Sequence, residues 1–89
     1  MAWTISYTES ALKPLRKLDR STARRLIDFM DERIAPLADP RDQGKALRGP
    51  AFATLWRCRV GDYRLVCEIQ DAAVVVLVVS IGDRGEAYR

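Results

Sequence analysis

Histidine is absent from this chain, and its absence excludes several kinds of chemistry at once. Without imidazole there is no His-activated nucleophile, no His general acid or base, and no His metal ligand. The two cysteines, Cys58 and Cys67, are too few for a disulfide framework and lack the spacing of a metal site. We interpret both as buried free thiols. No metal or other cofactor is expected, and any catalysis must use Arg, Lys, Tyr, Asp or Glu.

Long apolar runs are also missing. A membrane-spanning helix needs roughly 18 unbroken apolar residues, whereas the longest run here, Ala72 to Val79, has eight. The first residues lack the pattern of a basic segment followed by an apolar one, so no signal peptide is expected. These absences predict a cytoplasmic protein with no membrane partner.

The chain has 89 residues, 48% of them hydrophobic, which fits one folded domain over 1–89. Its net charge of +3 is unevenly distributed. Residues 1–44 hold eight basic and seven acidic groups, whereas Lys45 to Arg64 hold five basic groups and one acidic group. Such a local excess of positive charge is typical either of a polyanion-binding site or of a solvated surface.

The first half of the chain predicts a strand followed by two helices. Residues 3–7 alternate apolar and polar, as a half-buried strand does. Thr8 is a candidate N-cap for the first helix, in which Pro14 requires either a start near Lys13 or a kink. Asp19 or Ser21 caps a second helix, whose apolar spacing runs from Ala23 to Leu37. The stretch 36–44 is expected to be loop.

The second half predicts three strands. Gly61 and Asp62 separate two strand-like stretches and suit a tight hairpin turn, and 72–81 is apolar enough for an interior strand. The predicted order is β-α-α-β-β-β. This is an α+β fold, with a helical hairpin packed on one face of a small antiparallel-rich sheet.

The predicted hairpin gathers three arginines. If Gly61 and Asp62 form a two-residue turn, Arg59 faces Arg64 and Arg57 faces Val66, and cross-strand partners project to the same side. Like charges directly opposite each other destabilise a sheet, and an anion bound between them would relieve the repulsion. We therefore predict a phosphate-binding side that carries Leu55, Arg57, Arg59, Arg64, Val66 and Glu68. The opposite side, facing the helices, carries Trp56, Cys58, Val60, Tyr63, Leu65, Cys67 and Ile69.

At this point the sequence resembles the RelE/ParE superfamily of bacterial toxins, and the RelE-type mRNA interferases in particular. The resemblance covers nearly the whole chain and depends on "ALRG" (46–49), "WRCRVGDYRLV" (56–66), "IGDRGEAYR" (81–89) and the order of the elements. It implies a ribosome-dependent endoribonuclease that cuts mRNA by 2′-hydroxyl attack without metal. It also implies a cognate antitoxin as partner, with operator DNA bound only through the antitoxin complex.

The resemblance also implies roles for individual residues. Arg57 and Arg64 match catalytic basic residues of two neighbouring strands, Arg84 matches the arginine after the last strand, and Tyr88 matches a C-terminal tyrosine. Weaker candidates for RNA contact are Lys45, Arg48 and Arg59.

The sequence departs from the family pattern at two positions. Leu55 stands where some members have a lysine proposed as general base, and Asp83 stands where many have histidine. Since arginine, with a pKa above about 12, is a poor base, Asp83 and Tyr88 remain as candidate proton acceptors. Two alternative functions stay open: a ParE-like DNA gyrase inhibitor, and a catalytically degenerate toxin that acts as operator co-repressor with its antitoxin.

Overall fold

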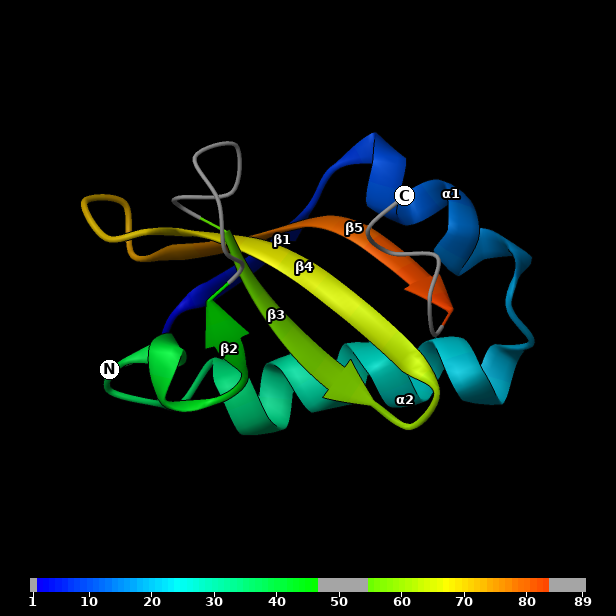
Figure 1. The fold of residues 1–89 in the computed structure, drawn as a ribbon, viewed down its shortest axis with the longest axis horizontal. Coiled ribbons are helices and arrows are strands. Elements are labelled where there is room, and N and C mark those ends of the chain that lie inside the picture. The colour runs from blue at the N-terminus through cyan, green and yellow to red at the C-terminus, as the bar shows by residue number, and fades with distance from the viewer. Residues whose placement is uncertain (1, 47–54, 84–89) are drawn as a thin grey trace.

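The computed structural model describes residues 2–46 and 55–83, in which two helices pack on a mixed five-stranded sheet (Figure 1). β1 runs parallel to β5, and the other neighbouring strands are antiparallel. The predicted α+β architecture is confirmed, with one short strand, β2, that the sequence did not reveal. In the spatial order β1-β5-β4-β3-β2, the strands are β1 (Thr4–Tyr7), β5 (Val75–Asp83), β4 (Tyr63–Gln70), β3 (Leu55–Val60) and β2 (Lys45–Ala46).

The first helix, α1 (Glu9–Lys17), begins at the predicted cap. The backbone N–H of Ala11 donates to the hydroxyl oxygen of Thr8 at 3.2 Å, which satisfies one of the amides that lack a partner at a helix start. Because the helix already begins at Glu9, the alternative of a start near Lys13 is wrong. Pro14 lies inside the helix.

The second helix, α2 (Arg20–Phe29), is capped by Asp19 rather than Ser21. One oxygen of the Asp19 carboxylate accepts from the backbone N–H of Thr22 at 3.2 Å and from the Ser21 hydroxyl at 2.6 Å. The other oxygen accepts from the Thr22 hydroxyl at 2.6 Å. The hydrogen bonds from Ser21 and Thr22 stabilise the charged carboxylate and lower the pKa of Asp19 to about 2.

The α-helix ends at Phe29, well before Leu37, the last residue of the predicted apolar spacing. A π-helical turn (Met30–Ile34) follows α2, and the backbone N–H of Ala35 donates to the carbonyl oxygen of Met30 at 2.9 Å. This wider turn buries both Met30 and Ile34. The apolar spacing indicated the buried residues correctly but could not show the change of helix type. A short 3₁₀ helix (Pro40–Asp42) then interrupts the predicted loop.

The interior position of β5 is confirmed, since it lies between β1 and β4. Val76 and Val78 are buried on the side facing the helices, whereas Val75 and Leu77 on the other side are half-buried. The strand begins at Val75 rather than Ala72, because the residues before it form the turn from β4.

The last residue of that turn, Val74, has a φ of 54°. This left-handed conformation is costly for a β-branched residue. The backbone N–H of Val74 donates to the Asp71 carbonyl oxygen at 3.2 Å, so the turn closes at the expense of local strain.

The core lies between the helices and one face of the sheet. α2 passes behind β3 and β4 in Figure 1, so that view looks onto the opposite face. Within residues 2–46 and 55–83, no helix is long and apolar enough to cross a membrane. The core is formed by buried side chains from α1, α2, the π-helical turn and β3–β5: Ala11, Leu15, Leu26, Met30, Ile34, Cys58, Val60, Leu65, Cys67, Val76, Val78 and Ile81.

Candidate functional site

The β3–β4 hairpin has the register that the sequence predicted. Val60 pairs with Tyr63, Arg59 with Arg64 and Arg57 with Val66. Gly61 has a φ of 61°, which fits the first central position of a type II′ turn, where glycine is preferred. The two-residue turn therefore sets the pairing of all the residues that follow it.

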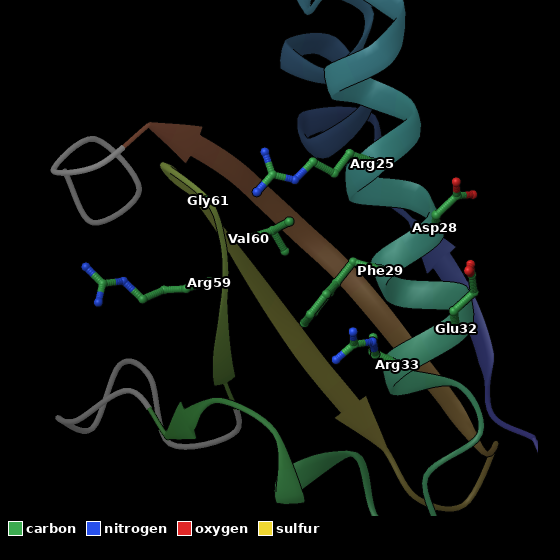
Figure 2. A pocket seen from close by; sticks show the side chains of 8 residues that line it. All are labelled: Arg25, Asp28, Phe29, Glu32, Arg33, Arg59, Val60 and Gly61. Atoms are coloured by element: carbon green, nitrogen blue, oxygen red, sulfur yellow. The ribbon is translucent and has the colours of Figure 1, made fainter.

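This register separates the two faces of the hairpin. Cys58, Val60, Leu65, Cys67 and Ile69 are buried on the side facing the helices, as predicted. We call the other side, which carries Leu55, Arg57, Arg59, Arg64, Val66 and Glu68, the arginine face. In Figure 2, Val60 points toward α2 while Arg59 points the opposite way. The alternation of the strands therefore places the cations away from the core.

The short strand β2 adds a fourth cation to the arginine face. Lys45 pairs with Arg57, so both project to the same side of the sheet. Gly44, just before it, has a φ of 80°, and a Cβ built there would lie 1.9 Å from the carbonyl oxygen of Arg57. Only glycine allows the two backbones to approach this closely.

Two further contacts hold the segment before β2 in place. The Arg41 guanidinium donates to both carboxylate oxygens of Asp71, at 3.0 and 2.7 Å, which ties the 3₁₀ helix to the β4–β5 turn. This hydrogen-bonded pairing lowers the pKa of Asp71 and raises that of Arg41. The indole N–H of Trp56 also donates to the Gln43 carbonyl oxygen at 2.7 Å. None of these contacts follows from a sequence pattern, because the partners are distant in the chain.

The four cations differ in exposure. Arg57 and Arg64 are half-buried, with the Nε atom of Arg64 fully covered, whereas Arg59 and Lys45 are exposed. Charge–charge interactions are stronger where water is partly excluded. Arg57 and Arg64 are therefore better placed to bind one phosphate firmly, and Arg59 and Lys45 to attract a longer polyanion.

Cavities adjoin these cations. One of about 280 Å³ is lined by Gln43, Gly44, Lys45, Arg57 and Arg59. A smaller one of about 50 Å³ is lined by Arg59, Gly61, Asp62, Tyr63 and Arg64. Arg59 lines both cavities, so each of them is bordered by at least two basic side chains.

A third cavity, of about 370 Å³, opens between α2 and the end of β3 (Figure 2). Phe29 and Val60 line its apolar part, and the Arg25 guanidinium reaches toward Gly61. A Cβ on Gly61 would lie 2.9 Å from an Arg25 nitrogen. No sequence pattern indicated this cavity, because its lining residues come from both halves of the chain.

The remaining predicted site residues, Arg48, Arg84 and Tyr88, lie outside the described residues. Asp83 is described only in its backbone, which pairs with Tyr63. Of the predicted set, the structure brings together Arg57, Arg59, Arg64 and Lys45. The predicted burial of the free thiols Cys58 and Cys67 is confirmed.

Comparison with known proteins identifies the family. A family model described as the ParE toxin of type II toxin–antitoxin systems, parDE, matches residues 5–88. The chain belongs to the RelE/ParE toxin superfamily. The toxin is 34% identical to the mRNA interferase toxin RelE of Escherichia coli (strain K12) over 90 residues, which cover 99% of this chain and 92% of that protein.

Solved structures agree in fold. The toxin–antitoxin complex RelBE2 from Mycobacterium tuberculosis contains a chain similar to this toxin, with a TM-score of 0.83, 26% identity and coverage of 97% of this chain and 95% of that one. A mutant of E. coli toxin RelE in complex with an antitoxin RelBc peptide has a TM-score of 0.73, 32% identity and coverage of 98% and 87%.

Proposed function

We propose that this toxin is an endoribonuclease that cleaves mRNA on the ribosome by attack of the substrate's own 2′-hydroxyl group, without a metal ion. The observation that carries the proposal is the gathering of Arg57, Arg59, Arg64 and Lys45 on the arginine face. The similarity to a protein named mRNA interferase supports it. Cytoplasmic mRNA and the ribosome are the partners that follow.

The chemistry needs cations more than it needs a metal. When the 2′-oxygen attacks the neighbouring phosphorus, negative charge accumulates on the phosphorane, and the P–O5′ bond then breaks to leave a 2′,3′-cyclic phosphate and a 5′-hydroxyl. Guanidinium groups bind phosphate oxygens in pairs of hydrogen bonds. Removing one such preorganised donor typically costs about 10²–10³ in rate.

Each predicted residue has a place in this scheme. The half-buried Arg57 and Arg64 bind the scissile phosphate, and the exposed Arg59 and Lys45 contact the RNA backbone on either side, together with Arg48. Arg84 and Tyr88 complete the site in the proposal, as a further cation and as a base-stacking or proton-transferring group.

A cognate antitoxin is the proposed protein partner. Solved relatives include a toxin–antitoxin complex and a toxin bound to an antitoxin peptide. In our proposal the antitoxin holds the toxin inactive, and the toxin reaches operator DNA only as part of that complex.

The test is to map RNA 5′ ends shortly after induced expression of the toxin, and of an Arg64→Ala variant. We expect new ends within codons for the toxin and a loss of about 10²–10³ in cleavage rate for Arg64→Ala. Arg64→Lys keeps the charge but loses the paired hydrogen bonds, so it should cleave at an intermediate rate. Arg24→Ala, which removes an exposed arginine from α2, is the control and should cleave as the parent does.

Two results would favour the other functions. Toxicity that blocks replication and damages DNA while transcripts stay intact would indicate a gyrase inhibitor. Intact transcripts without toxicity, combined with operator repression by the antitoxin complex, would indicate a degenerate toxin. Purified toxin should also fail to cleave ribosome-bound mRNA that carries a 2′-deoxyribose at the cleavage position, and cleavage there would refute the 2′-hydroxyl mechanism.

A further inference from the structure

The proposed cleavage requires a group that removes the 2′-hydroxyl proton, and the arginine face offers one. We propose that Glu68 is this general base, an inference that rests on the proposed function. In the described strands, Glu68 is the only acidic residue that the register places on the arginine face. Arginine and lysine are protonated at neutral pH and accept no proton, whereas a carboxylate does.

The register places Glu68 beside the proposed phosphate site. Arg64, Val66 and Glu68 are every second residue of β4, so their side chains project from the same face. Successive members of this series lie about 6.8 Å apart along the strand. Arg57 pairs with Val66 and is therefore diagonal to both Arg64 and Glu68, within reach of long side chains. A phosphate bound between Arg57 and Arg64 has Glu68 on the far side of Arg57, where the adjoining ribose can present its 2′-hydroxyl.

A neutral side chain holds the carboxylate of Glu68 in place, and no cation is paired with Glu68 on either neighbouring strand. The Gln70 side-chain amide donates to Glu68 Oε1 at 2.8 Å, so Oε2 is the atom we assign to the proton. The residues paired with Glu68 on the neighbouring strands are Leu55 of β3 and Leu77 of β5.

The charged groups that share this face are all basic and sit farther along it. In the described strands they are Arg57 and Arg59 of β3, Lys45 of β2 and Arg64 of β4. On the far side of β5, β1 presents only Thr4 and Ser6. Half-burial of Glu68 limits competition from water for its free oxygen.

The proton and electron balance of the step is complete. Oε2 of Glu68 takes the 2′-hydroxyl proton, and the 2′-oxygen forms a bond to phosphorus. The P–O5′ bond breaks, and the 5′-oxygen leaves with its electron pair and takes a proton from water. The proton on Glu68 then returns to water, so the enzyme is unchanged and the RNA ends as a cyclic phosphate and a 5′-hydroxyl.

The test compares single-turnover cleavage of ribosome-bound mRNA by the full-length toxin and by Glu68→Gln, across the pH range in which the ribosome stays intact. A carboxylate base within the site takes the place of hydroxide in removing the proton, so the parent rate should be nearly independent of pH. Glu68→Gln should lose about 10²–10⁴ in rate. Its remaining rate should rise tenfold per pH unit, because hydroxide then replaces the missing base.

Two further variants separate the role of the base from a structural role. Glu68→Asp keeps a carboxylate but withdraws it by one methylene, so we expect an intermediate rate that is still independent of pH. Glu9→Gln makes the same chemical change in α1, where Glu9 pairs with Arg16, and should leave the rate unchanged. Thermal melts establish whether each variant is folded. If Glu68→Gln does not fold, the rate of Glu68→Asp and its dependence on pH test the role of Glu68 instead.

The outcomes are distinguishable. If the parent toxin cleaves and Glu68→Gln cleaves within threefold of it, or loses rate without gaining pH dependence, Glu68 is not the base and the proposed function stands. If Glu68→Asp cleaves as slowly as Glu68→Gln and with the same pH slope, the assignment also fails. If the parent toxin does not cleave ribosome-bound mRNA, the proposed function fails, and the role of Glu68 fails with it.

Discussion

Replacing Gly44 by alanine tests whether the arginine face depends on close contact between β2 and β3. Gly44 has a φ of 80°, and a Cβ there would lie 1.9 Å from the Arg57 carbonyl oxygen. A non-glycine residue in this conformation costs about 1–3 kcal/mol. The overlap involves backbone rather than a movable side chain, so β2 must separate from β3 to relieve it.

The loss of stability expected for Gly44→Ala can be estimated from the contacts that break when β2 separates from β3 and from the cost of the backbone conformation. The pairs of Lys45 with Arg57 and of Ala46 with Trp56 are lost, as is the 2.7 Å hydrogen bond from Trp56 to Gln43. With about 1 kcal/mol for that hydrogen bond and about 2 kcal/mol for the backbone conformation, the free energy of unfolding should fall by about 3 kcal/mol. For a domain of this size this corresponds to a fall in Tm of about 12–24 °C.

Gly61→Ala is the matched comparison. Gly61 also has a positive φ, 61°, but its Cβ would meet the flexible end of Arg25, at 2.9 Å, which can move aside. We expect a loss of about 1 kcal/mol and a fall in Tm of about 4–8 °C. Thermal melts followed by circular dichroism measure both variants, and amide hydrogen exchange at Lys45 and Arg57 should accelerate only in Gly44→Ala.

A further variant separates the contribution of the β2 backbone to stability from that of the Lys45 side chain. Lys45→Ala removes the exposed lysine but leaves the backbone of β2 in place, so its Tm should stay within about 2 °C of the parent, as for most surface substitutions. If Gly44→Ala melts within a few degrees of Gly61→Ala, the close approach of β2 to Arg57 does not limit stability, and our account of β2 is wrong.

Two further predictions concern stability. Val74 adopts a φ of 54°, so Val74→Gly should relieve strain and raise Tm by about 4–8 °C, for a gain of about 1 kcal/mol; a lower Tm would show that the side chain contributes more than the strain costs. Asp19 has its pKa lowered to about 2, so the charged carboxylate is favoured in the folded state. Its contribution to stability should be complete above about pH 4, the unfolded value, and should disappear as the pH falls through about 2. The Tm difference between the parent and Asp19→Ala should shrink across that window, and a Ser21→Ala, Thr22→Val double variant should lose most of the dependence. A Tm difference that stays constant down to pH 2 would contradict the hydrogen-bonded cap.

Local rules account for much of what could be predicted. The register of the β3–β4 hairpin follows from a two-residue turn and a side-chain period of two, which is why Arg59 was correctly placed opposite Arg64. Thr8 was recognisable as a cap because a hydroxyl residue preceded a helical apolar pattern. Glu68 was placed on the correct face for the same reason as the arginines, but nothing local indicated that it would be the only acidic residue of the described strands there.

Other features depend on contacts between distant residues. The sequence left Asp19 and Ser21 as equal candidates for a cap, and the geometry of the Thr22 amide selected Asp19. The start of β5 moved to Val75 because the preceding residues form a turn that includes a valine in a left-handed conformation, which no propensity favours. A two-residue strand such as β2 carries no periodicity at all, so it appears only once Gly44 meets the backbone of Arg57.

The sequence by itself determined which side chains share a face, because strand alternation and a glycine at the turn leave only one pairing that buries the apolar residues. It therefore determined that Arg57, Arg59 and Arg64 lie together, away from the core. Only the tertiary structure decided that Lys45 joins them and that basic residues from separate segments line cavities there. The physical reason is that pairing within a hairpin is governed by neighbouring residues, whereas the approach of β2 to β3 depends on backbone groups that meet only after the chain has folded.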